Sequence, residues 1–241
     1  VMVTPMRITA VLTDLDLTLT NSNLVIEPKV VDTVQRLRRA EIQVILASGG
    51  SIYSVQSVAH YIGATKAAVG ENGGVISLGP KIQVLGGMEE PVRAYQALRK
   101  ELGPVVTAKT MKPRFSEIVL ERMLPLHRAR DIIRRQGIDA KIVDTRVAYH
   151  LMSLEVDKGK GATHVLRKLR LLRDEVAVFG DGENDIELFR VGGYRIALAN
   201  SVEELKRRAD WVSNEGFGDG FVDGVGHLAR EDLIPKDLIP P

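Results

Sequence analysis

The sequence predicts an α/β fold, with a Rossmann-like parallel-sheet core that carries an inserted α+β domain. Short apolar, β-branched runs alternate with helical patterns in both the first and the last part of the chain. The rhythm changes for about seventy residues in between, which is typical of an insert. We therefore assign residues 1–80 and 155–241 to the core and residues 81–154 to the insert.

The first part of the core contains three uniformly apolar runs that predict strands buried on both faces. Between them, apolar residues recur at three- and four-residue spacing, as they do on one face of a helix. Pro28 suits a first helical turn, and Gly63 suits a helix end. The predicted strands are 8–13, 42–47 and 67–69, and the predicted helices begin near residues 28 and 52.

The insert and the last part of the chain are read in the same way. In the insert we expect helices near 91–102 and 125–136 and extended segments at 115–120, 140–143 and 147–151. Beyond it we expect helices near 162–171, 184 and 202–209 and strands at 176–179 and 195–198. We interpret the glycine-rich segment 216–226 as a loop beside the cleft and residues 234–241 as a surface extension.

Composition excludes several classes of function. The 33 Lys and Arg against 31 Asp and Glu leave a net charge of +2, which does not indicate a nucleic-acid partner. No apolar run approaches the roughly 18 residues of a membrane span. The absence of cysteine rules out disulfides and thiolate catalysis, and with Pro5 and Arg7 where a signal peptide would be apolar, it favours a cytoplasmic protein. Nothing in the composition excludes a homodimer.

Acidic and hydroxyl side chains follow three of the predicted core strands. Asp14 and Asp16 come after the first strand, Ser48 after the second, and Asp181 and Asp185 after strand 176–179. An aspartate in such a place is by itself commonly a cap or turn residue. Ligands of open parallel sheets bind at the carboxyl ends of the strands, so we expect these five residues to converge on one crevice.

Four carboxylates in one crevice need a cation, because each would otherwise raise the pKa of the others. The sequence offers oxygen ligands there and no cysteine or neighbouring histidine. Such a donor set favours Mg²⁺. Mg²⁺ also keeps some of its waters, and a phosphate oxygen can take the place of one of them. We therefore expect a magnesium site formed by these acids.

Two further residues suit a phosphate. Ser48 begins Ser48-Gly49-Gly50 at a strand-to-helix turn, where a hydroxyl and free N–H groups can hold phosphoryl oxygens, although a plain N-cap is an equal alternative. Lys158 stands where the α/β rhythm resumes and can supply a positive charge. The neighbouring Lys160 is the competing candidate.

These segments together resemble the four motifs of the haloacid dehalogenase-like (HAD) phosphatases. The matching residues, in the family's order, are Asp14-Leu-Asp16-Leu-Thr18, Ser48-Gly49, Lys158-Gly159 and Gly180-Asp181-Gly-Glu-Asn184-Asp185. The insert is similar to the α/β cap of the sugar-phosphatase branch, and Glu71-Asn72-Gly73 looks like the loop after that branch's third strand. Within the branch, the layout is most like the archaeal-type phosphoglycolate phosphatases.

The resemblance implies a role for each matching residue. Asp14 would be the nucleophile, and Asp16 the general acid and then the general base. Mg²⁺ would be held by Asp14, Asp181 and Asp185 and by the main-chain carbonyl of Asp16, with Asn184 as an orienting residue. Ser48, Gly49 and Lys158 would bind the transferring phosphoryl group. The implied activity is phosphomonoester hydrolysis of a small phosphorylated metabolite, with 2-phosphoglycolate favoured.

One residue departs from the family pattern. Glycine is usual directly after the second aspartate of the first motif, and this chain has Leu17. Leucine resists backbone angles that glycine adopts freely, so we expect a strained or re-routed loop. Every residue with a chemical role is nevertheless present, which favours activity.

Alternatives remain open at this point. A sugar-phosphate phosphatase or a phosphomutase of the same superfamily would use the same motifs, and a signalling module could form an aspartyl-phosphate, though it needs no insert. Arg114 and Lys112 are candidates for binding a substrate carboxylate. We interpret the histidines as surface or packing residues, because no pair has zinc spacing; they are His60, His127, His150, His164 and His227.

Overall fold

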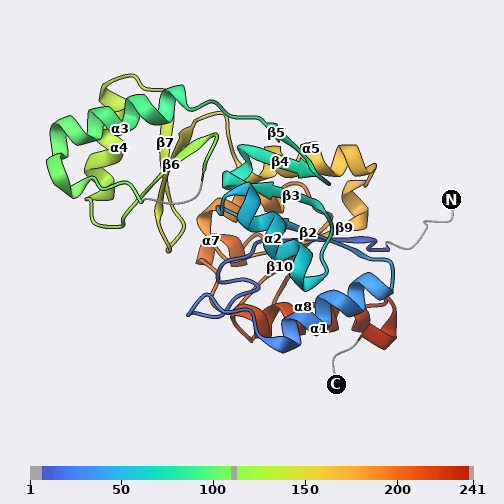
Figure 1. The fold of residues 1–241 in the computed structure, drawn as a ribbon. Coiled ribbons are helices and arrows are strands. Elements are labelled where there is room, and N and C mark those ends of the chain that lie inside the picture. The colour runs from blue at the N-terminus through green and yellow to red at the C-terminus, as the bar shows by residue number, and fades with distance from the viewer. Residues whose placement is uncertain (1–6, 110–112, 239–241) are drawn as a thin grey trace, which may run out of the picture.

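A central eight-stranded sheet organises the larger part of the computed structural model, which describes residues 7–109 and 113–238 (Figure 1). The strand order is β11-β10-β9-β1-β2-β3-β4-β5. The strands are β1 (Ala10–Thr13), β2 (Gln43–Ala47), β3 (Ala67–Gly70), β4 (Val75–Leu78), β5 (Lys81–Val84), β9 (Val176–Gly180), β10 (Tyr194–Ala197) and β11 (Trp211–Val212).

The chain direction in this sheet decides where its ends converge. From β11 to β3 all neighbouring strands are parallel, whereas β4 and β5 pair antiparallel to complete one edge. In the sheet, β2 lies on one side of β1, and β9, which comes much later in the chain, lies on the other side. The carboxyl ends of β1, β2 and β9 therefore lie side by side at the point where the strand order reverses, where such sheets bind ligands.

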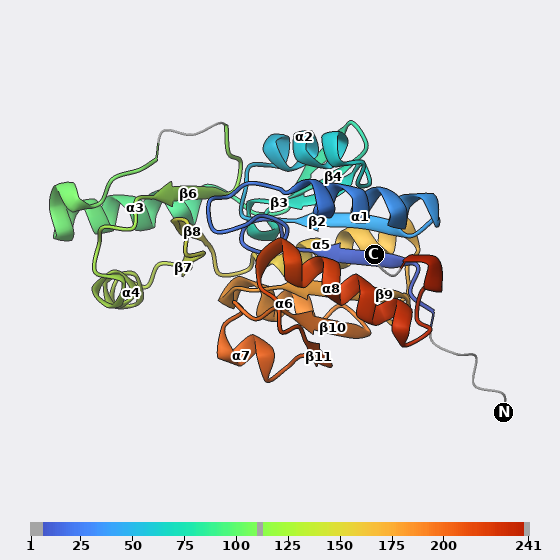
Figure 2. The ribbon, with the colours of Figure 1, turned by 90° about the horizontal axis from the view of Figure 1, so that it is seen from below.

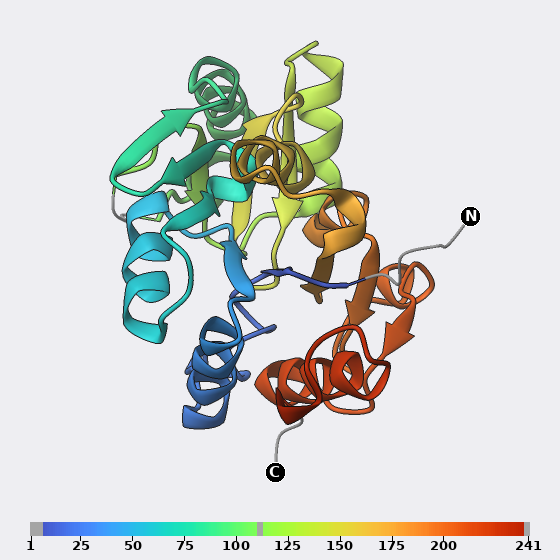
Figure 3. The ribbon, with the colours of Figure 1, turned by 90° about the vertical axis from the view of Figure 1, so that its right-hand side faces the viewer.

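Helices cover both faces of the sheet, as the predicted Rossmann-like class requires. One face is packed by α1 (Pro28–Arg39), α2 (Ile52–Ile62) and α8 (Phe217–Arg230). The other face is packed by α5 (Lys158–Leu169), α6 (Ile186–Phe189) and α7 (Glu203–Lys206). Figure 3 shows α1 in blue beside α8 in red. Alternate residues of each central strand enter the two apolar clusters, which explains their uniformly apolar sequence.

The helix α8 corrects the sequence analysis, which predicted a loop for residues 216–226. Gly218 and Gly224 face the sheet and α1 so closely that a Cβ on Gly218 would lie 2.7 Å from Val30 Cγ2. A Cβ on Gly224 would lie 2.4 Å from Phe179 Cε1. The glycines thus allow close packing of a helix, and the stabilisation by that packing outweighs their low helix propensity.

The insert forms a second sheet of three antiparallel strands in the order β6-β8-β7. Its strands are β6 (Glu117–Leu120), β7 (Ala140–Asp144) and β8 (Tyr149–Ser153), and its helices are α3 (Glu89–Leu102) and α4 (Leu126–Arg135). Both helices pack on one apolar cluster with this sheet. Figures 1 and 2 show this α+β unit to one side of the larger sheet.

The boundary of the insert differs from the expected one. The sequence analysis began the insert at residue 81, but β5 (Lys81–Val84) pairs with β4 in the core sheet. Leu85 and Gly86 continue this attachment, since both of their N–H groups donate to the Gly74 carbonyl. We propose a cap of residues 87–154 on a core formed by the remainder.

The remaining regular structure consists of short 3₁₀ turns. They are η1 (Glu71–Gly73), η2 (Gly103–Val105), η3 (Arg173–Glu175), η4 (Glu183–Asp185) and η5 (Lys236–Leu238). Across residues 7–109 and 113–238, no helix has the length and apolar character needed to cross a membrane.

Candidate active site

Asp14 and Asp16 lie in the loop that leaves the central strand β1. The loop is tied by a hydrogen bond from the Leu17 N–H to Thr20 Oγ1, 2.8 Å apart. Leu17 has a φ of 63°, in the left-handed region that glycine would adopt without strain. Leucine thus adopts a left-handed conformation that strains an L-residue, in line with the expected strained loop.

Three carboxylates meet at the carboxyl ends of β1 and β9. Asp14, Asp181 and Asp185 each offer an oxygen within 4.8 Å of the others, and all three side chains are buried. Thr18 Oγ1 donates to Asp181 Oδ1 at 3.0 Å. Asp185 Oδ2 accepts from the N–H groups of Asp181 and Gly182 at 3.0 and 2.9 Å. The convergence predicted from the strand ends is thus present.

Lys158 is the buried cation of this cluster. Its ammonium group contacts Asp14 Oδ1 and lies 2.8 Å from Asp185 Oδ1. The position is set by the start of α5, which the side chain of Asp157 caps, four residues before the predicted start of this helix. Lys160 points elsewhere, because it is largely exposed and donates to the Glu155 carbonyl. Of the two lysines, Lys158 is thus the one that lies in the acidic cluster.

Burial and mutual repulsion govern the titration of the acids. Burial raises the pKa of Asp14 to about 7; Lys158 opposes the shift, and Asp185 and Asp16 add to it. The pKa of Lys158 is raised, because Asp14 and Asp185 outweigh the effect of burial. A second cation bound beside Lys158 would favour the ionised form of Asp14 near neutral pH. The acidic cluster therefore favours cation binding.

The donors fit a divalent metal. Asp181 Oδ2 is buried and contacts the Arg146 guanidinium, yet it accepts no hydrogen bond of regular geometry from the part of the chain that the structure describes. Carboxylate oxygens from three residues form the hard donor set that Mg²⁺ requires. The side chain of Asp16 is outside this group.

Ser48 lies at the end of β2, beside Asp16. Its Oγ is 3.5 Å from Asp16 Oδ2 and accepts from the Gly50 N–H at 2.9 Å. The N-cap of α2 is Ser51, whose Oγ accepts from the Ser54 N–H, so the alternative of Ser48 as a plain cap is wrong. The pKa of the Asp16 carboxyl is raised by burial, despite the opposing effect of Lys158.

A cavity of about 360 Å³ opens beside these groups. Its walls include Asp14, Asp16, Ser48 and Gly49 from the core and Arg114 and His150 from the insert. A volume of this size is near the lower end for ligand sites, which favours a small substrate. The insert thus supplies part of the wall around the predicted site residues.

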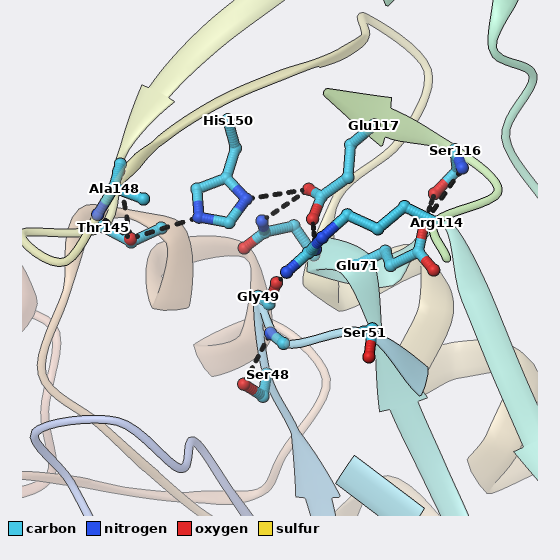
Figure 4. A network of polar contacts seen from close by, with 12 residues as sticks. Ser48, Gly49, Ser51, Glu71, Arg114, Ser116, Glu117, Thr145, Ala148 and His150 are labelled. Atoms are coloured by element: carbon cyan, nitrogen blue, oxygen red, sulfur yellow. Dashed lines mark hydrogen bonds and ion pairs between the residues drawn. The ribbon is translucent and has the colours of Figure 1, made fainter. Parts of the chain in front are cut away.

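Arg114 and His150 share one buried carboxylate, Glu117 (Figure 4). Arg114 also donates to the Gly49 carbonyl at 2.8 Å, so the sequence candidate Arg114 does reach the site, while Lys112 lies outside the described residues. His150 was interpreted as a surface or packing residue. Its place within the otherwise apolar run of β8 was the signal available in the sequence.

The loop after β3 connects the core to the insert. Glu71, Asn72 and Gly73 all have positive φ, and a Cβ on Gly73 would lie 1.9 Å from the Asp157 carbonyl oxygen. Asn72 donates to Glu117 and accepts from Asn184, both at 3.0 Å. Glu71 Oε2 accepts from the N–H groups of Phe115 and Ser116 at 2.8 and 2.9 Å. The loop therefore fixes the insert next to the acidic cluster.

Comparison with known proteins agrees with this geometry. The sequence profile of the haloacid dehalogenase-like hydrolases matches residues 11–87 and 130–224, which include every acid of the cluster. The chain belongs to this family. It is an enzyme of the phosphatase type, which confirms the family resemblance and the α/β fold class.

Several curated proteins are similar over most of their length. A phosphoglycolate phosphatase of Archaeoglobus fulgidus is 37% identical over 222 residues, covering 91% of this chain and 96% of that protein. One from Nitrosopumilus maritimus is 34% identical, covering 90% and 94%.

Solved structures with lower identity support the HAD fold. A Thermoplasma acidophilum protein superposes with a TM-score of 0.81 at 21% identity, covering 92% of this chain and 98% of its own. The sucrose-phosphatase of Synechocystis superposes with a TM-score of 0.69 at 16% identity, covering 92% and 98%.

Proposed function

We propose that this chain is a Mg²⁺-dependent phosphomonoesterase that acts on a small phosphorylated metabolite, 2-phosphoglycolate. The observation that carries the proposal is the meeting of Asp14, Asp181 and Asp185 around Lys158, beside the pair of Asp16 and Ser48. This arrangement combines a nucleophile, an acid, a cation site and phosphate-binding donors in one cavity.

Asp14 is the proposed nucleophile. One of its carboxylate oxygens attacks phosphorus, the bond from phosphorus to the ester oxygen breaks, and an aspartyl-phosphate forms. Asp16 gives its proton to the leaving oxygen, which suits a carboxyl whose pKa is raised by burial. Asp16 then takes a proton from the water that attacks the aspartyl-phosphate, which releases phosphate and regenerates Asp14.

Lys158, Ser48 and Gly49 are proposed to bind the phosphoryl group. Lys158 is already held between Asp14 and Asp185, so its charge lies where phosphoryl oxygens must approach the nucleophile. Ser48 Oγ faces the Asp14 to Asp16 loop through its contact with Asp16. These donors offset negative charge that builds up during transfer.

Mg²⁺ is proposed to bind Asp14, Asp181, Asp185 and the main-chain carbonyl of Asp16. When bound, it neutralises the clustered acids and polarises a phosphoryl oxygen. Asn184 orients the loop that carries Asp181 and Asp185 through its hydrogen bond to Asn72. Without the metal, Asp14 is only partly ionised near neutral pH even beside Lys158, since burial raises its pKa to about 7.

Two observations support 2-phosphoglycolate as the substrate. Curated relatives that are 33 to 37% identical over most of the chain carry the name phosphoglycolate phosphatase. The cavity is small, and its wall includes the guanidinium of Arg114 next to His150. A short substrate with a carboxylate beyond the phosphate fits both observations.

A phosphate-release screen tests this function. The purified chain is assayed with 2-phosphoglycolate, sugar phosphates and nucleotides, with Mg²⁺ and after exhaustive chelation with EDTA. We expect 2-phosphoglycolate to have the highest kcat/KM and all turnover to require the metal. Full activity after chelation would refute the metal assignment, and a preference for a sugar phosphate would refute the substrate.

A further inference from the structure

The insert contributes a charged cluster to the cavity that the phosphate chemistry does not use. Glu117, at the start of β6, is fully buried and accepts from Asn72 Nδ2 at 3.0 Å and from His150 Nδ1 at 3.0 Å. The Arg114 guanidinium contacts its second oxygen. Figure 4 shows the side chains of Arg114 and His150 pointing toward this carboxylate.

Both ring nitrogens of His150 have partners. Nδ1 donates to the Glu117 carboxylate, because an ionised carboxylate only accepts. Nε2 lies 3.3 Å from Thr145 Oγ1, which can donate to it or accept from it. Glu117 and Thr145 together fix the orientation of the His150 ring.

Glu117 is the buried counter-ion of Arg114. Burial alone would raise the pKa of Glu117, but His150, Arg114 and Asn72 outweigh it and lower the pKa, so Glu117 is ionised. Glu117 thereby holds the Arg114 guanidinium at the cavity wall.

Arg114 also keeps an unused donor. Its Nη1 group donates to Glu117 and to the Gly49 carbonyl. Its Nε group has no hydrogen-bond partner within residues 7–109 and 113–238. The side chain is 9% exposed, so water does not freely satisfy this group. The guanidinium edge that carries Nε is the edge that can bind a carboxylate with two parallel hydrogen bonds.

Arg114 and His150 both lie directly over the proposed phosphate-binding turn. Arg114 is hydrogen-bonded to Gly49, and a Cβ on Gly49 would lie 3.3 Å from His150 Cε1. Arg114, His150, Ser48 and Asp14 line the same cavity. An anion bound to Arg114 is therefore close to the phosphate, within the length of a short molecule.

We propose that Arg114 forms a carboxylate subsite that selects short phosphorylated acids, with Glu117 as the counter-ion that positions its guanidinium and His150 as the residue that positions Glu117. This proposal rests on the proposed function and adds to it the residues that read the substrate. The phosphate occupies the end of the cavity near Asp14 and Ser48, and the carboxylate occupies the end near Arg114 and His150. His150 and Glu117 are the residues that the sequence did not single out.

The binding test uses two phosphonates that cannot be hydrolysed. 3-Phosphonopropionate has the length of 2-phosphoglycolate and keeps the carboxylate, whereas propylphosphonate lacks it. In calorimetry with Mg²⁺, we expect the intact chain to bind the first about 10- to 100-fold more tightly, as charge-assisted hydrogen bonds allow. Arg114→Gln and His150→Gln should each remove most of this preference and leave propylphosphonate binding within about threefold.

A kinetic test and a matched control complete the design. Arg114→Gln should lower kcat/KM for 2-phosphoglycolate selectively, compared with ethyl phosphate. Arg122→Gln is the control. Like Arg114, Arg122 is a cap arginine paired with a carboxylate, in its case that of Asp144, but it is absent from the cavity wall. If Arg114→Gln lowers the melting temperature, His150→Gln and Arg114→Lys replace it in the same kinetic comparison.

The outcomes separate the two proposals. No preference for 3-phosphonopropionate in the intact chain, or equal losses for both phosphonates in the variants, overturns the carboxylate subsite, even if the chain hydrolyses phosphomonoesters. Absence of turnover on every phosphomonoester refutes the proposed function, while the binding preference still decides the subsite.

Discussion

The side-chain amide of Asn200 donates a hydrogen bond to the main-chain carbonyl of Leu17, 2.9 Å away. Asn200 Oδ1 in turn accepts from the Phe217 N–H at 2.7 Å, at the start of α8. The loop that follows β1 and carries the two proposed catalytic aspartates is thus fastened to the start of α8. This clamp holds Leu17 in its left-handed conformation, which costs an L-residue roughly 1–2 kcal/mol.

Leu17→Gly should leave the fold intact and change kcat by less than about tenfold, because the position supplies loop geometry and no chemical group. Relief of strain and the greater freedom of glycine in the unfolded chain oppose each other. The free energy of unfolding should therefore change by under about 1 kcal/mol. Urea denaturation and steady-state kinetics measure both quantities.

Arg170→Gly is the matched control for this change. Arg170 also has a positive φ, 58°, but it is an exposed residue at the end of α5, away from the cavity. It should show a similar small stability effect and full activity. An inactive Leu17→Gly chain with an unchanged melting curve would contradict the assignment of Leu17 to loop geometry.

Asp14→Asn should abolish turnover, because an amide of nearly the same shape is a poor nucleophile. Lys158 keeps its second partner, Asp185, at 2.8 Å, so the fold should persist. Phosphate release is compared with that of Asp131→Asn, which changes an exposed carboxylate in the cap. Residual activity above about one hundredth, a barrier change under about 2.7 kcal/mol, would point to another nucleophile.

Asp16→Asn should reduce the rate most for substrates with poor leaving groups. The departing oxygen of 2-phosphoglycolate needs a proton, whereas the p-nitrophenolate of p-nitrophenyl phosphate leaves with little acid assistance. The ratio of the two kcat/KM values, measured in the variant and in the unchanged chain, checks this. Equal losses on both substrates would argue against Asp16 as the general acid.

His227 should make the core less stable in mild acid. Its ring is stacked on Trp211 and lies 2.7 Å from the Tyr194 hydroxyl, and burial lowers its pKa despite Glu231 and Asp223. The unfolded chain, with a histidine pKa near about 6.5, therefore binds the proton first as the pH falls. The stabilisation is complete above about pH 6.5 and is lost as the pH falls toward the folded-state pKa.

Chemical denaturation of the intact chain and of His227→Gln at pH 7.5 and pH 5.5 measures this effect. Carboxylates also titrate in that range, so the quantity of interest is the difference between the two chains. The unchanged chain should lose more stability, by up to about 1.4 kcal/mol for each unit by which the pKa is lowered. Parallel losses in both chains would show that His227 does not contribute.

The sequence by itself determined the core and the acids at its strand ends. Uniformly apolar runs must be buried on both faces, and parallel strands bring their carboxyl ends to one edge of the sheet. This reasoning located Asp14, Asp181 and Asp185 together, and the structure confirms that they meet. The resemblance to the HAD phosphatases, which usually have glycine at this position, pointed to Leu17 as a residue under backbone strain, and Leu17 does have a positive φ.

Other features depend on contacts that local patterns do not encode. The helix α8 forms through its glycines because Phe179 and Val30 approach it from distant strands and helices. β5 joins the core because β4 offers it a free edge. Glu117 and His150 are 33 residues apart and meet because β6 and β8 are neighbours in the cap sheet. Local propensity sets which elements form, but the pairing of distant side chains was decided by how those elements pack.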